Sequence, residues 1–172
     1  MPDAESHSEI LADATTDARR NPVDPDLRDL FVFEAGARTF AVPADQVDGI
    51  TEARVPVVLP HTPQAILGVV CVRGRMLTVV DPTVLLTGQS LRWPHALPCV
   101  IALRGDEQLA LAAQSCRDQI KIAVKEIRPA SDDSENTAFK IVRHDGEEII
   151  VLNVNYLFAS AMRQRERRRR RF

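Results

Sequence analysis

The feature that most constrains the fold is a series of short segments rich in valine, isoleucine and leucine that begins at Leu27. Gly or Pro bounds these segments about every eight to twelve residues, a spacing typical of all-β proteins. The clearest hairpin joins residues 66–72 to residues 76–80 around Gly74, because glycine readily supplies the positive φ of a tight turn. Roughly ten such strands, divided near residue 90, predict an all-β fold of two small barrels that share a core.

Helices and one irregular connection interrupt this pattern. Asp81 and Pro82 can begin a short helix, since Asp caps the first backbone amides and Pro suits the first helical position. A second helix is expected to begin after Asn153 and to continue toward the C-terminal arginines. Three prolines within residues 56–63 predict an extended connection and not a central strand.

Charge divides the chain into three regions, although the net charge is only −2. Residues 1–26 carry seven acids against two arginines, and they contain too few apolar side chains to offset ordering entropy. They are predicted to form a disordered acidic leader before a folded domain at residues 27–160. An arginine-rich tail, residues 161–172, follows that domain. No apolar run approaches the ~20 residues of a membrane helix, and no secretory signal is visible, so we expect a cytoplasmic protein.

The sequence contains no recognisable catalytic or metal-binding constellation. GxSxG, P-loop and GxGxxG motifs are absent, and no histidine stands at metal-ligand spacing from another histidine or a cysteine. Cys71, Cys99 and Cys116 are odd in number and lack paired spacing, so we interpret them as small buried hydrophobic residues. We therefore expect no enzymatic activity, no cofactor and no metal.

The order and spacing of the segments from about Leu30 to Phe158 resemble the CheW-like domain of bacterial chemotaxis adaptors. That family opens with Leu-Val-Phe followed by Tyr/Phe-Ala-Val/Ile-Pro, which residues 30–33 and 40–43 match. Its most specific signature is Gly-Val-Ile-Asn-Leu-Arg-Gly, followed by Pro-Val-Val-Asp-Leu, and residues 68–74 and 77–81 match it. The chain departs from the pattern, where Glu, Asn and Asp are usual, at Gly49, Cys71 and Gln114.

The resemblance implies two intertwined SH3-like five-stranded barrels, with short helices, a C-terminal helix and no catalytic activity. It implies an adaptor that binds the regulatory domain of a CheA-type histidine kinase and links it to chemoreceptor tips or other array proteins. Such an adaptor would lie in the cytoplasm, at membrane-associated or polar chemosensory arrays. Gly68, Arg73 and Gly74 match the motif positions most associated with partner contact in the family, and Val47 and Ile50 fall on the nearby apolar contact strand.

Structural roles remain open for all five residues. Arg73 can be a solvated hairpin charge, and Gly68 and Gly74 can be required by backbone geometry alone. Val47 and Ile50 can fill the barrel interior, because one face of every barrel strand must do so.

The arginine tail and the biological system also leave alternatives. The tail can solubilise the chain, dock on a partner or an anionic membrane surface, or bind nucleic acid without sequence readout. No specific nucleic acid is expected, but a nucleic-acid-binding β-barrel is the alternative from a different class. Within the adaptor class, a type IV pilus or other alternative chemosensory system is the second possibility. The candidate docking residues of the tail are Arg167, Arg168, Arg169, Arg170 and Arg171.

Overall fold

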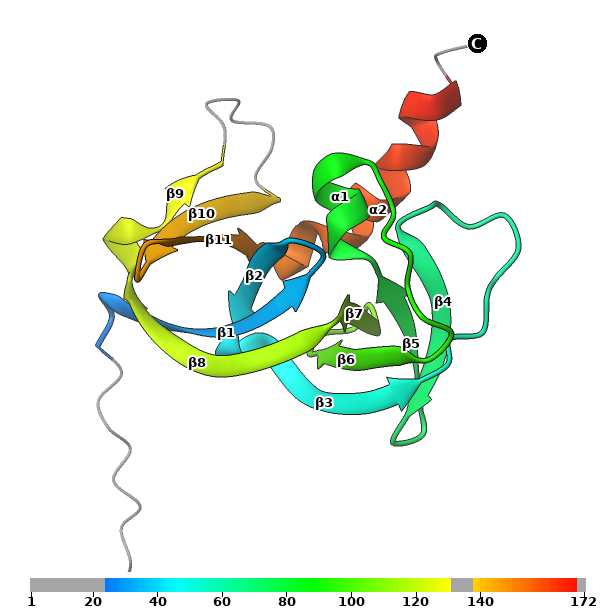
Figure 1. Cartoon of the computed structure of the whole chain (residues 1–172), viewed down its shortest axis with the longest axis horizontal. Helices are drawn as coiled ribbons and strands as arrows, with labels where there is room; N and C mark the ends of the chain where they lie inside the picture. Colours follow the sequence, from blue (N-terminus) through cyan, green and yellow to red (C-terminus); the bar gives the residue numbers. More distant parts are fainter. Residues whose placement is uncertain (1–23, 131–137, 170–172) are drawn as a thin grey trace, which may run out of the picture.

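The computed structural model describes residues 24–130 and 138–169, and it describes the side chains of the last helix as far as Met162. Most of the predicted acidic leader, residues 1–26, therefore lies outside the described residues. Within the described ranges the chain is mainly strand, with a few short helical segments (Figure 1). In chain order the elements are β1 (Leu27–Ala35), β2 (Arg38–Pro43), η1 (Ala44–Gln46), β3 (Val47–Arg54), β4 (Ile66–Val72), β5 (Arg75–Val80), α1 (Pro82–Thr87), β6 (Leu97–Leu103), β7 (Leu109–Ala113), β8 (Ser115–Ala123), η2 (Val124–Glu126), β9 (Arg128–Pro129), β10 (Phe139–His144), β11 (Glu147–Leu152) and α2 (Val154–Arg169).

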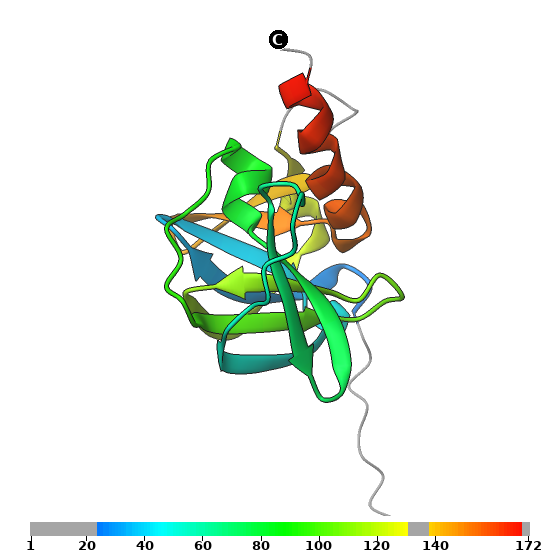
Figure 2. The same cartoon turned by 90° about the vertical axis from the view of Figure 1, so that its right-hand side faces the viewer.

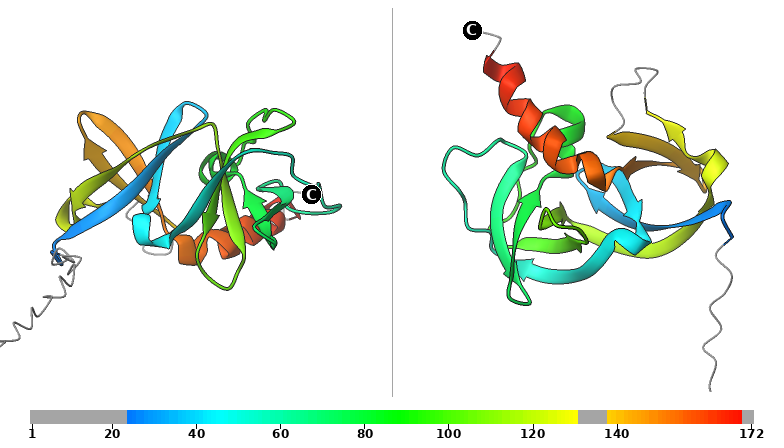
Figure 3. Two further views of the ribbon diagram at one scale, coloured as in Figure 1. Left: turned by 90° about the horizontal axis from the view of Figure 1, so that it is seen from below. Right: turned by 180° about the vertical axis from the view of Figure 1, so that it is seen from behind.

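The described strands form two curled sheets that lie side by side in Figure 1 and in the view from below in Figure 3. Sheet A has the strand order β8-β1-β2-β11-β10-β9, and sheet B has the order β3-β6-β7-β5-β4. Neighbouring strands are antiparallel except for the parallel pairs β2 with β11 and β5 with β7. The prediction of two intertwined SH3-like barrels is confirmed, and sheet A gains a short sixth strand in β9.

The two sheets exchange strands. The β1–β2 hairpin lies in sheet A, but β3 crosses to sheet B and pairs with β6. The β6–β7 hairpin lies in sheet B, and β8 crosses in the opposite direction to pair with β1. The predicted division near residue 90 is therefore wrong, because strands of sheet B both precede and follow that position. Residues 27–87 and 97–169 instead repeat one order of elements: a hairpin, a crossing strand, a second hairpin and a helix.

Three apolar clusters stack across the molecule, so the central strands are buried on both faces. Along β1, Leu30 and Val32 point into the cluster inside sheet A, whereas Phe31 and Phe33 point into a larger cluster between the sheets. Phe33 stacks on Phe40 of β2 in this shared core, with ring centroids 5.7 Å apart. Alternate residues of a strand face opposite sides, and both sides are buried here. The sequences of these strands are therefore continuous apolar runs. The shared core is the one that the sequence predicted.

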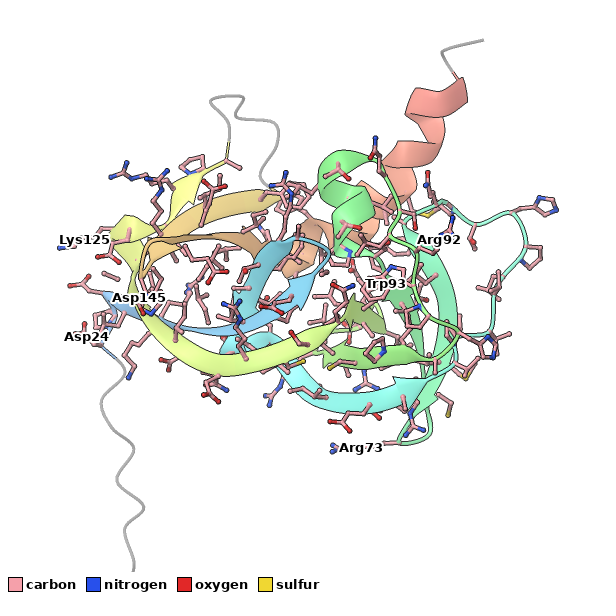
Figure 4. All side chains as sticks on the ribbon, in the orientation of Figure 1. Asp24, Arg73, Arg92, Trp93, Lys125 and Asp145 are labelled. Carbon is pink, nitrogen blue, oxygen red and sulfur yellow. The ribbon has the colours of Figure 1, made fainter. Side chains whose placement is uncertain are left out.

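Asp81 fixes the start of α1 and the loop that leads to β6. Its carboxylate is fully buried and accepts hydrogen bonds from the backbone amide of Thr83 at 2.9 Å and from the Trp93 indole at 2.8 Å. A buried carboxylate needs such donors, because an unpaired buried charge costs several kcal/mol. The helix ends at Gly88, whose φ is +74°. Figure 4 shows Trp93 beside α1.

Candidate protein-interaction surface

A groove lies on sheet B where the edge strand β3 faces the β4–β5 hairpin. The volume of this groove is about 220 Å³. Figure 2 shows the β4–β5 hairpin face-on. We call this groove the β3 groove. Its floor includes Leu77 and Ala102, and its rim carries exposed Ile50 and several charged side chains. The groove was not evident in the sequence, because β3 and the β4–β5 hairpin that flank it stand at opposite ends of the strand order of sheet B.

Arg73 is the cationic centre of the β3 groove. It occupies the turn between β4 and β5 with a φ of +50°, and Figure 4 shows it at the hairpin tip near β3. A Cβ atom at Gly49 would lie 3.8 Å from its guanidinium group, so the glycine backbone of β3 lies beneath the arginine. Among the described residues, Arg73 has no hydrogen-bond or ion-pair partner. The groove therefore offers a guanidinium that no carboxylate neutralises.

Arg75 differs from Arg73 although it lines the same groove. Its guanidinium lies 2.9 Å from the carboxylate of Asp48 on β3, and both side chains are about two-fifths exposed. An exposed pair of this kind contributes roughly 0–1 kcal/mol to stability. The charge of Arg75 is therefore neutralised by Asp48, whereas the charge of Arg73 is not. Arg73 is the stronger candidate of the two for binding an anionic group of a partner.

The other predicted contact residues separate into different environments. Ile50 lies in the β3 groove with 45% of its surface exposed. Val47 is half-buried and packs against the shared core, which favours its structural role. Gly74 lies in the hairpin turn with a φ of +77°, and a Cβ atom there would meet nothing within 4 Å. Arg73 and Ile50 are therefore brought together, whereas Val47 faces inward.

Gly68 is required by a close approach of two backbone segments. A Cβ atom there would lie 2.4 Å from the Val57 carbonyl oxygen, and the φ of Gly68 is +141°. The backbone of Val57 forms two hydrogen bonds with the backbone of Val69, with N···O distances of 2.8 and 2.9 Å. Gly68 thus holds the proline-containing connection against β4, and it shapes this surface through the backbone without presenting a side chain.

This connection adds an apolar surface that the sequence analysis did not single out. Val57 and Val58 are 66% and 75% exposed, and Met76 on β5 is 56% exposed. Cys71, which pairs with Met76 across the hairpin, is also exposed, so its predicted burial is wrong. The three prolines of the connection could have indicated this surface. They make the segment irregular, and an irregular segment cannot bury all of its apolar side chains in a regular sheet.

The candidate docking residues of the arginine tail are only partly described. The backbone of α2 continues through Arg169, so the predicted extension of the last helix into the arginines is confirmed. Arg170 and Arg171 lie outside the described residues, and the side chains of Arg167 to Arg169 are not described either. Docking by the tail stays a prediction. Among the helices of the described residues, none combines the length and the hydropathy that a membrane span requires.

The perturbed carboxylates of sheet A form an ion-pair network. Arg117 on β8 pairs with Glu34 on β1 and with Glu147 on β11. Hydrogen bonds from Ser115 and Arg117 hold the pKa of Glu34 below its ordinary value, and hydrogen bonds from Thr39 and Arg117 do the same for Glu147. The lowered pKa values show that the hydrogen bonds favour the charged form of both carboxylates. Within residues 24–130 and 138–169, no three His, Cys, Asp or Glu side chains gather as a metal site.

Comparison with known proteins places these features in a family. A model of the CheW-like domain matches residues 29–162. Chemotaxis protein CheW of Rhizobium meliloti (strain 1021) is 24% identical over 141 residues, which span 80% of this chain and 91% of that protein. The crystal structure of scaffolding protein TtCheW from Thermoanaerobacter tengcongensis has the same fold, with a TM-score of 0.64 and 22% identity over 76% of this chain and 92% of that chain. The chain therefore belongs to the CheW-like domain family.

Proposed function

We propose that this protein is a non-enzymatic chemotaxis adaptor that binds the regulatory domain of a CheA-type histidine kinase. It links that kinase to the cytoplasmic tips of chemoreceptors or to other array proteins, in the cytoplasm at membrane-associated or polar arrays. Family membership supports this role, as do the chemotaxis and scaffolding names of the two relatives. The two-barrel architecture supports it as well, since an adaptor needs separate faces for separate partners.

The observation that carries the proposal is the unneutralised guanidinium of Arg73 in the β3 groove beside exposed Ile50. Arginine next to apolar side chains is a common arrangement at the energetic centre of protein interfaces. In the family pattern a Glu often occupies the position of Gly49, and here the glycine leaves the space over β3 to Arg73. A carboxylate from the partner can therefore pair with Arg73, while the partner's apolar side chains cover Ile50.

Calorimetric titration with the CheA regulatory domain of the same organism tests this proposal. We expect the full chain to bind, and we expect Arg73→Glu to weaken binding at least tenfold, since breaking an interfacial charge pair typically costs ~2–5 kcal/mol. Arg143→Glu is the matched control, because it reverses an exposed arginine on β10 of the other sheet. We expect the control to bind within about twofold of the unaltered chain.

Three results would count against the proposal in different ways. No binding at high micromolar concentration contradicts kinase coupling. Equal losses from Arg73→Glu and Arg143→Glu mean that net charge, and not the β3 groove, sets the affinity. A loss that occurs only in a chain ending at Met162 moves the interface to the arginine tail.

A further inference from the structure

Two of the three cysteines meet across the shared core. The sulfur atoms of Cys99 on β6 and Cys116 on β8 lie 2.8 Å apart. Because β6 belongs to sheet B and β8 to sheet A, this contact joins the two sheets. Cys99 is buried in the shared core, and Cys116 is half-buried against it.

The separation of the two sulfurs is close to a disulfide bond length. A disulfide has an S–S length of about 2.03–2.05 Å, so the two sulfurs need to approach by only about 0.8 Å. Cys99 is held opposite Ala113 on β7, and Cys116 is held opposite Phe33 on β1. The β1–β8 register shifts next to Phe33, and such a bulge re-aims the neighbouring side chain. The two strands therefore present sulfurs that need little movement to reach bonding distance.

The two thiols also influence each other's protonation. The hydrogen bond from the Cys116 thiol lowers the pKa of Cys99, and the same contact together with burial raises the pKa of Cys116. The thiolate is the nucleophilic form of cysteine, so the sulfur that loses its proton can attack an oxidant while the other sulfur, 2.8 Å away, can complete a disulfide.

We propose that Cys99 and Cys116 are a redox-active dithiol, which a hydroperoxide converts to an internal disulfide that links sheet A to sheet B. One sulfur of the pair attacks a peroxide oxygen, the O–O bond breaks, and the alcohol or water leaves with a proton, so that a sulfenic acid forms on that sulfur. The other sulfur then displaces hydroxide from the oxidised sulfur, and that hydroxide leaves as water with the proton of the second thiol. The two thiols lose two protons and two electrons, which the peroxide accepts.

Peptide mapping of the full chain tests the proposal directly. Trypsin cleaves after Arg54, Arg73, Arg92, Arg104 and Arg117, so it places each cysteine on a different peptide: 55–73, 93–104 and 105–117. After treatment of the reduced protein with equimolar hydrogen peroxide, we expect two of three thiols to be lost. We expect peptides 93–104 and 105–117 to be linked, peptide 55–73 to keep its thiol, and dithiothreitol to reverse the change.

Variants separate the internal pair from the exposed thiol. Cys71→Ser should form the same linkage at the same rate, whereas Cys99→Ala and Cys116→Ala should form none. Oxidation should also raise the urea midpoint of the wild type and of Cys71→Ser, because a crosslink restricts the unfolded chain. The wild-type peptide map does not depend on whether the alanine variants fold.

Two outcomes would overturn the proposal. The first is survival of all three thiols in the folded chain under peroxide that oxidises the urea-unfolded chain. The second is a linkage that involves Cys71, or a disulfide-bonded dimer in place of the internal crosslink.

Discussion

Replacing Gly68 by alanine tests how the proline-containing connection is held against β4. The added methyl group would lie 2.4 Å from the Val57 carbonyl oxygen, which belongs to the backbone and cannot rotate away. The connection must therefore move, and its two hydrogen bonds to Val69 must lengthen or break. Gly74→Ala is the matched control, because Gly74 also has a positive φ but has open space around its Cβ position.

The expected losses of stability follow from these two environments. Gly74→Ala should cost about 1–2 kcal/mol, which is the penalty for an alanine in a left-handed conformation. Gly68→Ala should cost a similar backbone penalty of about 1–3 kcal/mol. It should also lose two hydrogen bonds worth about 0.5–1.5 kcal/mol each, for a total of about 2–6 kcal/mol. The difference between the variants isolates the close approach of the two segments.

Urea unfolding of the full-length variants, followed by the fluorescence of Trp93, measures this difference. The midpoint should fall further for Gly68→Ala than for Gly74→Ala, with little change in m value. Amide exchange at Val69 should accelerate only in Gly68→Ala, because that amide donates to the Val57 carbonyl. Equal losses in the two variants, with Val69 still protected, would refute the reasoning: the connection would then be free to shift without cost.

Two further perturbations act on polar contacts. Asp81→Ala should cost about 2–4 kcal/mol, because the helix loses its cap and the Trp93 indole loses its acceptor; urea unfolding measures this loss, and Asp81→Asn, which keeps an acceptor oxygen, should lose less. The pKa of Glu34 is lowered in the folded state, so its contribution to stability is present above its ordinary pKa of 4.5 and is lost as the pH falls through the folded value. The stability difference between the wild type and Arg117→Ala, measured in urea at about pH 7 and about pH 3, should therefore shrink in acid; a difference that does not change with pH contradicts the ion-pair account.

Local features of the fold were predictable from the sequence. Gly74 marked the β4–β5 turn, and Asp81 with Pro82 marked the start of α1, since each acts on backbone groups a few residues away. The strand exchange was not predictable, because apolar runs do not show which strands pair. The division expected near residue 90 failed for that reason, as β3 pairs with β6 and β8 pairs with β1, so each sheet combines strands from both halves of the chain.

The candidate surface was predicted by resemblance and was only partly visible in the residues themselves. Arg73 and Ile50 do meet in one groove. Alternation along β3 places Val47 and Ile50 on opposite faces, but it does not show which face the shared core covers. The contact between Cys99 and Cys116 was missed, because it depends on how β6 and β8 pack and not on the spacing of the cysteines. Long-range contacts of this kind require the folded topology.

The parallel pairing of β2 with β11 has a consequence for the timing of folding during synthesis. Thr39 is opposite Ile149, so one of the first strands of the domain must wait for one of its last. At a synthesis rate of about 5–20 residues per second, the β1–β2 hairpin leaves the ribosome roughly 5–20 s before its partner is available. Its apolar faces are exposed during that interval. A nascent chain of this protein therefore cannot complete sheet A until β11 emerges. During this delay chaperones can bind the chain, and unpaired strand edges can aggregate.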